Sequence, residues 1–66
     1  MMNRLRELRK ERGMAQQDLA NEMLISKRTI SRYESGERQP TLLMVFDLAD
    51  YFNVSIDYLV GRSDVR

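Results

Sequence analysis

Sixty-six residues, 42% of them hydrophobic and 32% charged, suffice for one small domain around a single core. The chain contains no cysteine, which excludes disulfides and thiolate metal sites. It also contains no histidine, the commonest metal ligand and acid–base catalyst. The composition therefore predicts a domain without a bound metal or cofactor, and it argues against an enzyme.

The net charge of +1 divides unevenly along the chain. Residues 1–40 carry nine Lys and Arg against six Asp and Glu, whereas residues 41–66 carry two against four. A basic half joined to an acidic half indicates an anionic partner on one side of the domain. No apolar leader follows Arg4, and the longest apolar run, over 42–46, is too short for a bilayer, so we expect a soluble cytoplasmic protein.

Three short helices are expected in the first half of the chain. Apolar residues three apart among strong helix formers, followed by Gly13, predict a helix over 3–12. A second helix is expected over 16–23, where apolar residues recur at i, i+1 and i+4. Ser26 is a good N-cap for a third helix over 27–35.

Two more helices are expected in the second half. Thr41 is placed to cap a helix over 42–52, and Asn53 tolerates the left-handed conformation that ends a helix. A last helix over 56–60 follows its own serine cap. The stripe expected to be buried on the fourth helix is Leu42, Val45, Leu48, Ala49 and Phe52. Strand-like alternation is absent, so the sequence predicts one all-α domain of five short helices over 1–66.

The second and third expected helices, with three residues between them, have the plan of a helix-turn-helix over 16–35. Apolar residues on both helices are placed to face each other, and Ala20 is small where the two helices must cross closely. We therefore expect these two helices to pack together as a unit.

The outward face of the third helix carries basic residues in unfavourable places. Arg28 and Arg32 form a like-charge pair at i, i+4, and Lys27 and Arg28 lie in the first turn, where the helix dipole disfavours cations. Local rules broken together on one exposed face are typical of a functional site, and an anionic groove would relieve both penalties. The alternative is an ordinary solvated face, but inside a helix-turn-helix pattern we favour nucleic-acid binding.

Four segments together resemble the phage repressor/Cro-type regulators, also called the XRE family: LRELRKERG at 5–13, QQDLA at 16–20, SKRTISRYESG at 26–36 and VSIDYLVG at 54–61. The resemblance covers nearly the whole chain. It implies a lambda-repressor-like five-helix domain whose third helix enters the major groove, usually as a homodimer on a palindromic operator. It further implies a sequence-specific transcriptional regulator, in this interpretation a repressor, encoded by a bacterium or phage and acting at the nucleoid.

The resemblance also implies roles residue by residue. Base contacts would fall on Lys27, Arg28 and Arg32, and a partly buried salt bridge would join Arg9 to Glu34. Contacts to the DNA backbone would fall on polar residues around the outward face of the third helix, namely Gln16, Ser26, Ser31, Ser35, Arg38 and Gln39.

Two residues depart from the family's usual pattern. The turn position usually held by Gly is Leu24, which carries a steric cost if its φ is positive. The N-cap of the second helix, usually Ser or Thr, is Ala15, which forfeits a cap worth about 0.5–2 kcal/mol. Both departures concern the turn and the helix start rather than the basic face.

An enzyme and a protein-interaction module are the two alternatives to DNA binding. An enzyme is disfavoured, because Asp47 and Asp50 share a helix face without a pocket-forming partner, and a solvated acidic face explains them better. Met14, Met23 and Met44 are interpreted as core filler rather than as a ligand set. The stronger alternative is an antitoxin-like or protein-interaction module built on the same fold.

The protein-interaction alternative rests on apolar residues that exceed what a core of this size can hide, namely Leu43, Met44, Phe46, Tyr51 and Tyr58. We expect such surface to serve a homodimer instead. The expected interface is Val54, Ile56, Tyr58 and the tail beyond Gly61, near the acidic C-terminal end and away from the basic face. No small-molecule ligand is expected, because no sensing domain follows Arg66.

Overall fold

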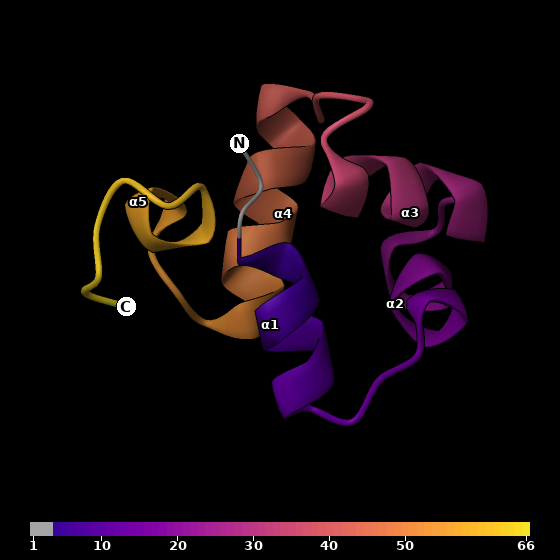
Figure 1. The fold of residues 1–66 in the computed structure, drawn as a ribbon, viewed down its shortest axis with the longest axis horizontal. Helices are drawn as coiled ribbons and strands as arrows, with labels where there is room; N and C mark the ends of the chain where they lie inside the picture. The colour runs from indigo at the N-terminus through magenta and orange to yellow at the C-terminus, as the bar shows by residue number, and fades with distance from the viewer. Residues whose placement is uncertain (1–3) are drawn as a thin grey trace.

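The computed structural model describes residues 4–66, which form five α-helices and, within that range, no β-strand (Figure 1). The helices are α1 (Leu5–Glu11), α2 (Gln16–Met23), α3 (Lys27–Ser35), α4 (Leu42–Phe52) and α5 (Ile56–Leu59). The all-α, five-helix prediction is confirmed, and the bounds of α2, α3 and α4 agree with it. Both α1 and α5 are shorter than expected, and residue 3, the expected start of the first helix, lies outside the described residues.

Three of the helices begin at a side-chain cap. The hydroxyl oxygens of Ser26, Thr41 and Ser55 accept hydrogen bonds from the backbone N–H three residues on, at 3.1, 3.2 and 3.0 Å. Each bond satisfies an N–H that a helix start leaves without an intrahelical partner. At the start of α2, Ala15 has no such side chain, and its own N–H donates to Asp18 Oδ2 at 2.8 Å.

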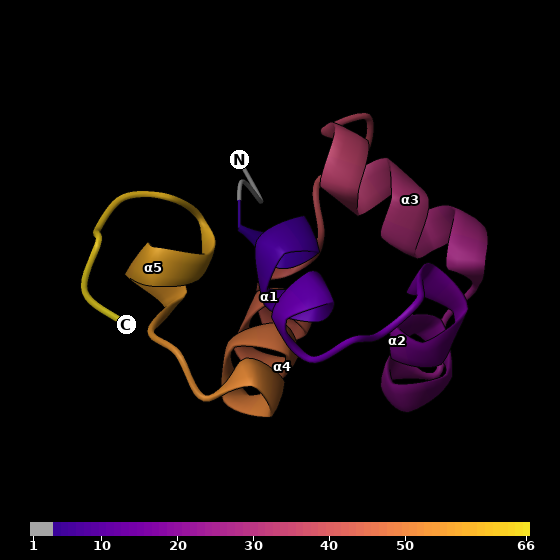
Figure 2. The ribbon, with the colours of Figure 1, turned by 60° about the horizontal axis from the view of Figure 1, so that its bottom comes forward.

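The helices fall into three groups. Figures 1 and 2 show α1 and α4 at the centre of the domain, with α2 and α3 packed together on one side and α5 on the other. Within the described residues the domain measures 28 × 23 × 19 Å. This arrangement leaves one long side of α3 without a covering helix.

The turn between α2 and α3 is tight and left-handed at its first residue. Leu24 has a φ of 59°, and the N–H of Ile25 donates back to the carbonyl of Ala20 at 3.0 Å. The Ile25 side chain then packs, half-buried, against the core. The backbone therefore reverses within three residues, and α3 crosses directly over α2.

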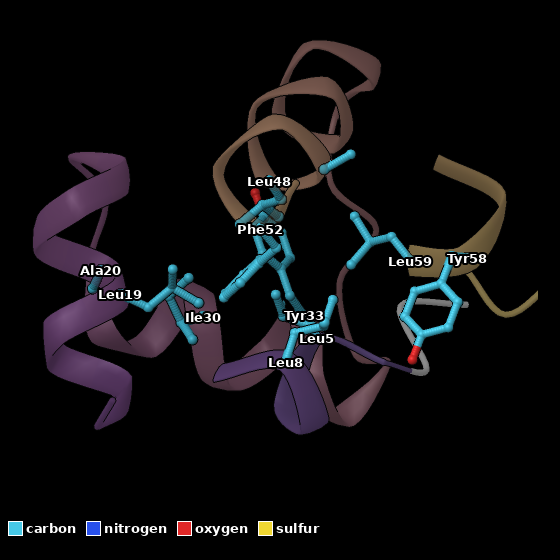
Figure 3. Close-up of a cluster of buried hydrophobic side chains, with 11 residues drawn as sticks. Leu5, Leu8, Leu19, Ala20, Ile30, Tyr33, Leu48, Phe52, Tyr58 and Leu59 are labelled. Atoms are coloured by element: carbon cyan, nitrogen blue, oxygen red, sulfur yellow. The ribbon is translucent and has the colours of Figure 1, made fainter. Parts of the chain in front are cut away.

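A single core joins all five helices (Figure 3). Each helix contributes one large aliphatic side chain that is fully buried, namely Leu5, Leu19, Ile30, Leu48 and Leu59. Burial of one such side chain stabilises the fold by about 1.5–3 kcal/mol. Because these residues come from every helix, the position of α3 relative to the other four helices is fixed by the core.

The expected burial of two residues is wrong. Leu42 was assigned to the buried stripe of α4, but it is 66% exposed, because the first turn of the helix extends beyond its neighbours. Tyr58 was assigned to the surface, but it is 8% exposed and belongs to the core. The guanidinium of Arg4 lies 4.0 Å from its ring centroid and that of Arg66 lies at 5.1 Å, so both chain ends help to cover this tyrosine.

Candidate nucleic-acid interface

The apolar and polar residues of α3, the candidate recognition helix, lie on different sides of the helix. Ile30 and Tyr33 are buried in the core. The remaining exposed or half-exposed positions include the set predicted to face DNA, namely Lys27, Arg28, Ser31, Arg32 and Ser35. The structure therefore brings all three predicted base-contacting residues onto the accessible side of one helix.

The basic residues at the start of α3 have little local compensation. The first turn contains no acidic residue, and neither Lys27 nor Arg28 forms an ion pair with any residue of 4–66. Arg32, one turn further on, has a long contact of 3.8 Å from Nε to Glu37 Oε2. The positive end of the helix dipole therefore coincides with two cations, as the sequence indicated.

Polar residues at the other end of α3 are engaged with their own backbone. The hydroxyl of Ser35 donates to the Arg32 carbonyl at 3.2 Å, and the N–H of Arg38 donates to the same carbonyl at 3.3 Å. Gly36, with a φ of 83°, ends the helix and turns the chain outward. The side chains of Arg38 and Gln39 are left exposed in the loop that follows.

The hydroxyl of Ser26, another predicted backbone contact, already caps α3. Its Oγ accepts from the Thr29 N–H and lies 2.8 Å from the Thr29 hydroxyl. The capping bond leaves the side chain exposed, so Ser26 is accessible and fixed in orientation.

A buried carboxylate lies behind the accessible face. The side chain of Glu34 is fully buried, and Arg9 donates to both of its oxygens, from Nε at 2.7 Å and from Nη2 at 3.1 Å. Arg9 also donates from Nη1 to the Met14 carbonyl at 2.8 Å. The Arg9–Glu34 pair implied by the family resemblance is thus present, and it ties α1 to α3.

Gln16 joins the same carboxylate from α2. Its Nε2 donates to Glu34 Oε1 at 3.1 Å, so the predicted phosphate-contacting residue is held by a hydrogen bond to α3. A buried side-chain network of this kind restricts the rotamers of its members. Gln16 is consequently oriented at the start of α2 before any ligand is present.

The pKa of Glu34 reflects this network. Burial alone raises the pKa of the Glu34 carboxyl, but the hydrogen bonds from Arg9 and Gln16, the charge of Arg9 and a hydrogen bond from Arg6 outweigh burial. The result is a pKa below the usual value of a glutamic acid. The Glu34 side chain is therefore ionised at neutral pH despite its full burial.

The structure adds one residue to this site that the sequence did not single out. Arg6 Nε lies 3.3 Å from Glu34 Oε1. The available signal was its position three residues before Arg9, which places both arginines on the same face of α1. That spacing alone does not reveal a common partner on α3, 28 positions away in the sequence.

The residues assigned to a dimer interface lie at the opposite end of the molecule. Val54 and Ile56 are half-buried and pack against the core, while Tyr58 is covered by the chain itself. Tyr58 therefore lacks the exposed surface that was expected of it. The dimer role of Val54 and Ile56 stays a prediction.

Neither a metal site nor a bilayer-spanning helix is found within residues 4–66. No group of three acidic side chains there is arranged to hold a metal ion, and no helix there is long and apolar enough to cross a membrane.

Two short helices packed across a tight turn, with a basic outer face on the second, define a helix-turn-helix domain. Comparison with protein families agrees: a model described as helix-turn-helix matches residues 5–59. The chain belongs to this XRE-type helix-turn-helix family. Membership places the domain among DNA-binding regulators and not among enzymes, as the sequence predicted.

Several curated proteins are similar to this chain. The HTH-type transcriptional regulator AnsR of Bacillus subtilis is 43% identical over 61 residues, which cover 92% of this chain and 53% of AnsR. The cryptic phage CTXphi transcriptional repressor RstR of Vibrio cholerae is 37% identical over 64 residues, or 97% of this chain and 58% of RstR. An uncharacterized HTH-type transcriptional regulator of Methanocaldococcus jannaschii is 35% identical over 57 residues, 86% of each chain. The chain thus spans about half the length of AnsR and RstR.

Proposed function

We propose that this domain binds double-stranded DNA sequence-specifically, with α3 in the major groove, and that it represses transcription from a palindromic operator as a homodimer. Lys27, Arg28 and Arg32 are the proposed base contacts. The proposal extends to a site of action at the nucleoid, in the cytoplasm, and to regulation without a small-molecule ligand.

The observation that carries the proposal is the division of α3 into a buried apolar side and an accessible basic side. An α-helix with its side chains is about 10–12 Å wide, and the major groove is about 12 Å wide, so α3 fits the groove along its exposed side. Arg28 and Arg32 lie one turn apart and present planar guanidinium groups, which bind guanine O6 and N7 in bidentate fashion. Base edges and phosphates would also relieve the unfavourable placement of Lys27 and Arg28.

Polar residues at both ends of the helix-turn-helix are placed to hold it in one orientation on DNA. Gln16 lies at the start of α2, and Ser35, Arg38 and Gln39 lie beyond the other end of the reading helix. Contacts to phosphates on either side of a groove fix the register of a recognition helix without reading sequence. Ser26 and Ser31 complete the proposed phosphate contacts between these two ends.

In vitro selection of bound oligonucleotides tests the proposal directly. The purified protein is incubated with random duplexes, and the bound fraction is amplified over several rounds and sequenced. We expect a two-fold symmetric site whose half-sites lie about 34 Å apart on one face of the duplex. Recovery of sequences without any enriched motif, at physiological salt, would contradict sequence-specific binding.

An exposed apolar stretch on α4 favours a second candidate, a protein-interaction module of antitoxin type. Leu42 and Leu43 are 66% and 74% exposed, and Phe46 is exposed one turn further on. Contiguous apolar surface on a small domain is typical of a contact with another polypeptide. A gel shift with the purified protein alone separates the two: a shifted duplex without a second polypeptide favours the regulator.

A further inference from the structure

Arg6 and Gln16 meet on one oxygen atom of the buried Glu34 carboxylate. Gln16 Nε2 donates to Glu34 Oε1 at 3.1 Å, and Arg6 Nε donates to the same oxygen at 3.3 Å. The two donors come from different helices, α2 and α1, and their separation cannot exceed the sum of these two distances. A ligand that contacts the Gln16 side-chain amide therefore lies within reach of the Arg6 side chain.

The charges of this cluster do not balance. Glu34 supplies one carboxylate, which Arg9 engages through both oxygens, and the Arg9 side chain is only 9% exposed. Among residues 4–66, no other carboxylate lies within ion-pair distance of Arg6 or Arg9. Two guanidinium groups thus face one carboxylate, and the excess positive charge resides on Arg6, whose side chain is 58% exposed.

The geometry of Arg6 leaves its outer donors available. Only Nε is used by Glu34, and among residues 4–66 neither Nη1 nor Nη2 has a hydrogen-bond partner. Arginine presents its donors as a planar fork, which matches the oxygens of a phosphate group. Glu34 holds one side of the guanidinium, so the remaining side is oriented rather than free to rotate.

We propose that Arg6 is a phosphate-contacting residue, and that it binds the same DNA phosphate as Gln16 while Glu34 acts as the positioning residue for both. This inference rests on the proposed function, because it needs DNA docked on α3. A phosphate monoanion at this place would match the excess charge, giving two anions for two guanidinium groups. The contact would add affinity for every DNA sequence and would read no base.

The test measures the salt dependence of DNA binding. Each phosphate contact made by a cation steepens the slope of log Kobs against log salt by about 0.9 on B-DNA. Arg6→Gln removes the charge, and we expect it to lower the slope by about 0.9, equally on the selected operator and on random duplex. Arg6→Lys keeps the charge and should retain the slope. Arg62→Gln, at an exposed arginine beyond α5, is the matched control and should change nothing.

A second experiment, with chemically modified operator DNA, locates the phosphate. An operator with a neutral methylphosphonate is made at each backbone position in turn, and the affinities of wild type, Gln16→Ala and Arg6→Gln are compared. At one position the methylphosphonate should weaken DNA binding by the wild type and have little further effect on binding by either variant. If Arg6→Gln changes the slope no more than Arg62→Gln does, or if the positions sensed by Arg6 and Gln16 differ, the inference is overturned. Wild-type protein that binds no DNA would instead overturn the proposed function.

Discussion

Leu24 and Asn53 end α2 and α4 in the same left-handed conformation, with φ values of 59° and 55°. The hydrogen bonds also correspond: Leu24 N–H donates to Asn21 O at 3.3 Å and Asn53 N–H to Asp50 O at 3.1 Å. The residue after each donates across the turn to an alanine carbonyl at 3.0 Å. Both are Schellman ends, which favour Gly or Asn at the left-handed position. Leucine occupies the same geometry at a higher steric cost.

The first prediction is that Leu24→Gly stabilises the domain. A left-handed non-glycine residue costs about 1–2 kcal/mol, while glycine adds about 0.5–1 kcal/mol of chain entropy to the unfolded state. Leu24 is 90% exposed, so little burial is lost. We expect a net gain of about 0.5–1 kcal/mol in urea unfolding.

The control is Leu43→Gly, which makes the same chemical change at another exposed leucine, inside α4. Leu43 lies in the first turn of α4 and has no positive φ, so glycine relieves no backbone strain there and should cost up to about 1 kcal/mol. Equal destabilisation by both variants would show that the turn conformation carries no penalty.

The second prediction is that Ala15→Ser stabilises the start of α2. Ala15 has the extended conformation of an N-cap, with φ −76° and ψ 163°, close to that of Ser26. Its N–H already bonds to Asp18, so serine would complete a reciprocal pair by accepting from the Asp18 N–H. We expect a gain of about 1 kcal/mol, or about 4–8 °C in Tm for a domain of this size. The control is Gln17→Ser, at the second residue of α2, where serine is not at the N-cap position and should not stabilise the domain.

The sequence predicted α3 and α4 well because their ends carry local signals, whereas α2, with Ala15 and Leu24 at its ends, was predicted from the spacing of its apolar residues. Ser26 and Thr41 cap their helices through their own hydroxyls, and Asn53 adopts the left-handed conformation that its side chain permits. The C-terminal ends of α1 and α5 are each followed by a glycine with positive φ, Gly13 and Gly61. The residue before each glycine, Arg12 or Val60, has already left helical geometry, so both helices end one residue earlier than expected. Helix ends are defined only to within one or two residues by such signals.

Three features of the structure could not be predicted from local sequence patterns. Leu42 has the correct spacing for the buried stripe, but its exposure depends on where the neighbouring helices stop. Tyr58 is covered by Arg4, 54 positions away in the sequence. The meeting of Arg6 and Gln16 on Glu34 likewise depends on how three helices pack, which no single helix encodes.

The third prediction concerns pH. Because the folded-state pKa of Glu34 is lowered, its ionisation stabilises the fold above the unfolded pKa of about 4.3, and this contribution is lost as the pH falls through the folded-state value. Glu34→Gln removes this dependence and leaves Arg9 buried without its counter-charge. We expect a loss of about 3–5 kcal/mol at pH 7 and a flatter acid limb in urea unfolding from pH 7 to pH 2.

Glu11→Gln serves as the exposed comparison for this experiment. The pKa of the Glu11 carboxyl is also lowered, chiefly by its hydrogen bond with Arg66, but the pair lies at the surface. Surface pairs are screened by water and salt, so the effect at pH 7 should be much smaller. Similar losses for both variants would show that burial of the Arg9–Glu34 pair is unimportant for stability.

The fourth prediction separates base reading from backbone contact. Arg28→Ala and Arg32→Ala should each cost about 1–3 kcal/mol on the selected operator and relax specificity at one base pair. Gln16→Ala should weaken specific and random duplexes more evenly, as the loss of a phosphate contact does. Binding is measured by fluorescence anisotropy on the operator, on its single-base variants and on random DNA. If the two arginine variants lose affinity equally on the operator, its single-base variants and random DNA, Arg28 and Arg32 do not read bases directly.

The last prediction is dimerisation, and it follows from the information that one helix can read. A helix of this length contacts about four or five base pairs, a word that recurs about every 10³ base pairs, whereas a genome offers about 10⁶ or more competing sites. Two copies on a two-fold axis square the discrimination. We therefore expect a dimer on the operator, detected by analytical ultracentrifugation of the complex.

The position of the dimer interface is tested by two matched sets of substitutions. Val54→Ser and Ile56→Ser remove half-buried apolar groups near α5, and Leu43→Ser removes an exposed one on α4. In a two-fold interface each change acts twice, so an interface at Val54 and Ile56 predicts a dimer weakened by about 10- to 100-fold for these variants. Leu43→Ser should then sediment as the wild type does. The reverse pattern would move the interface to the exposed leucines of α4, because those side chains have no cover within the described chain.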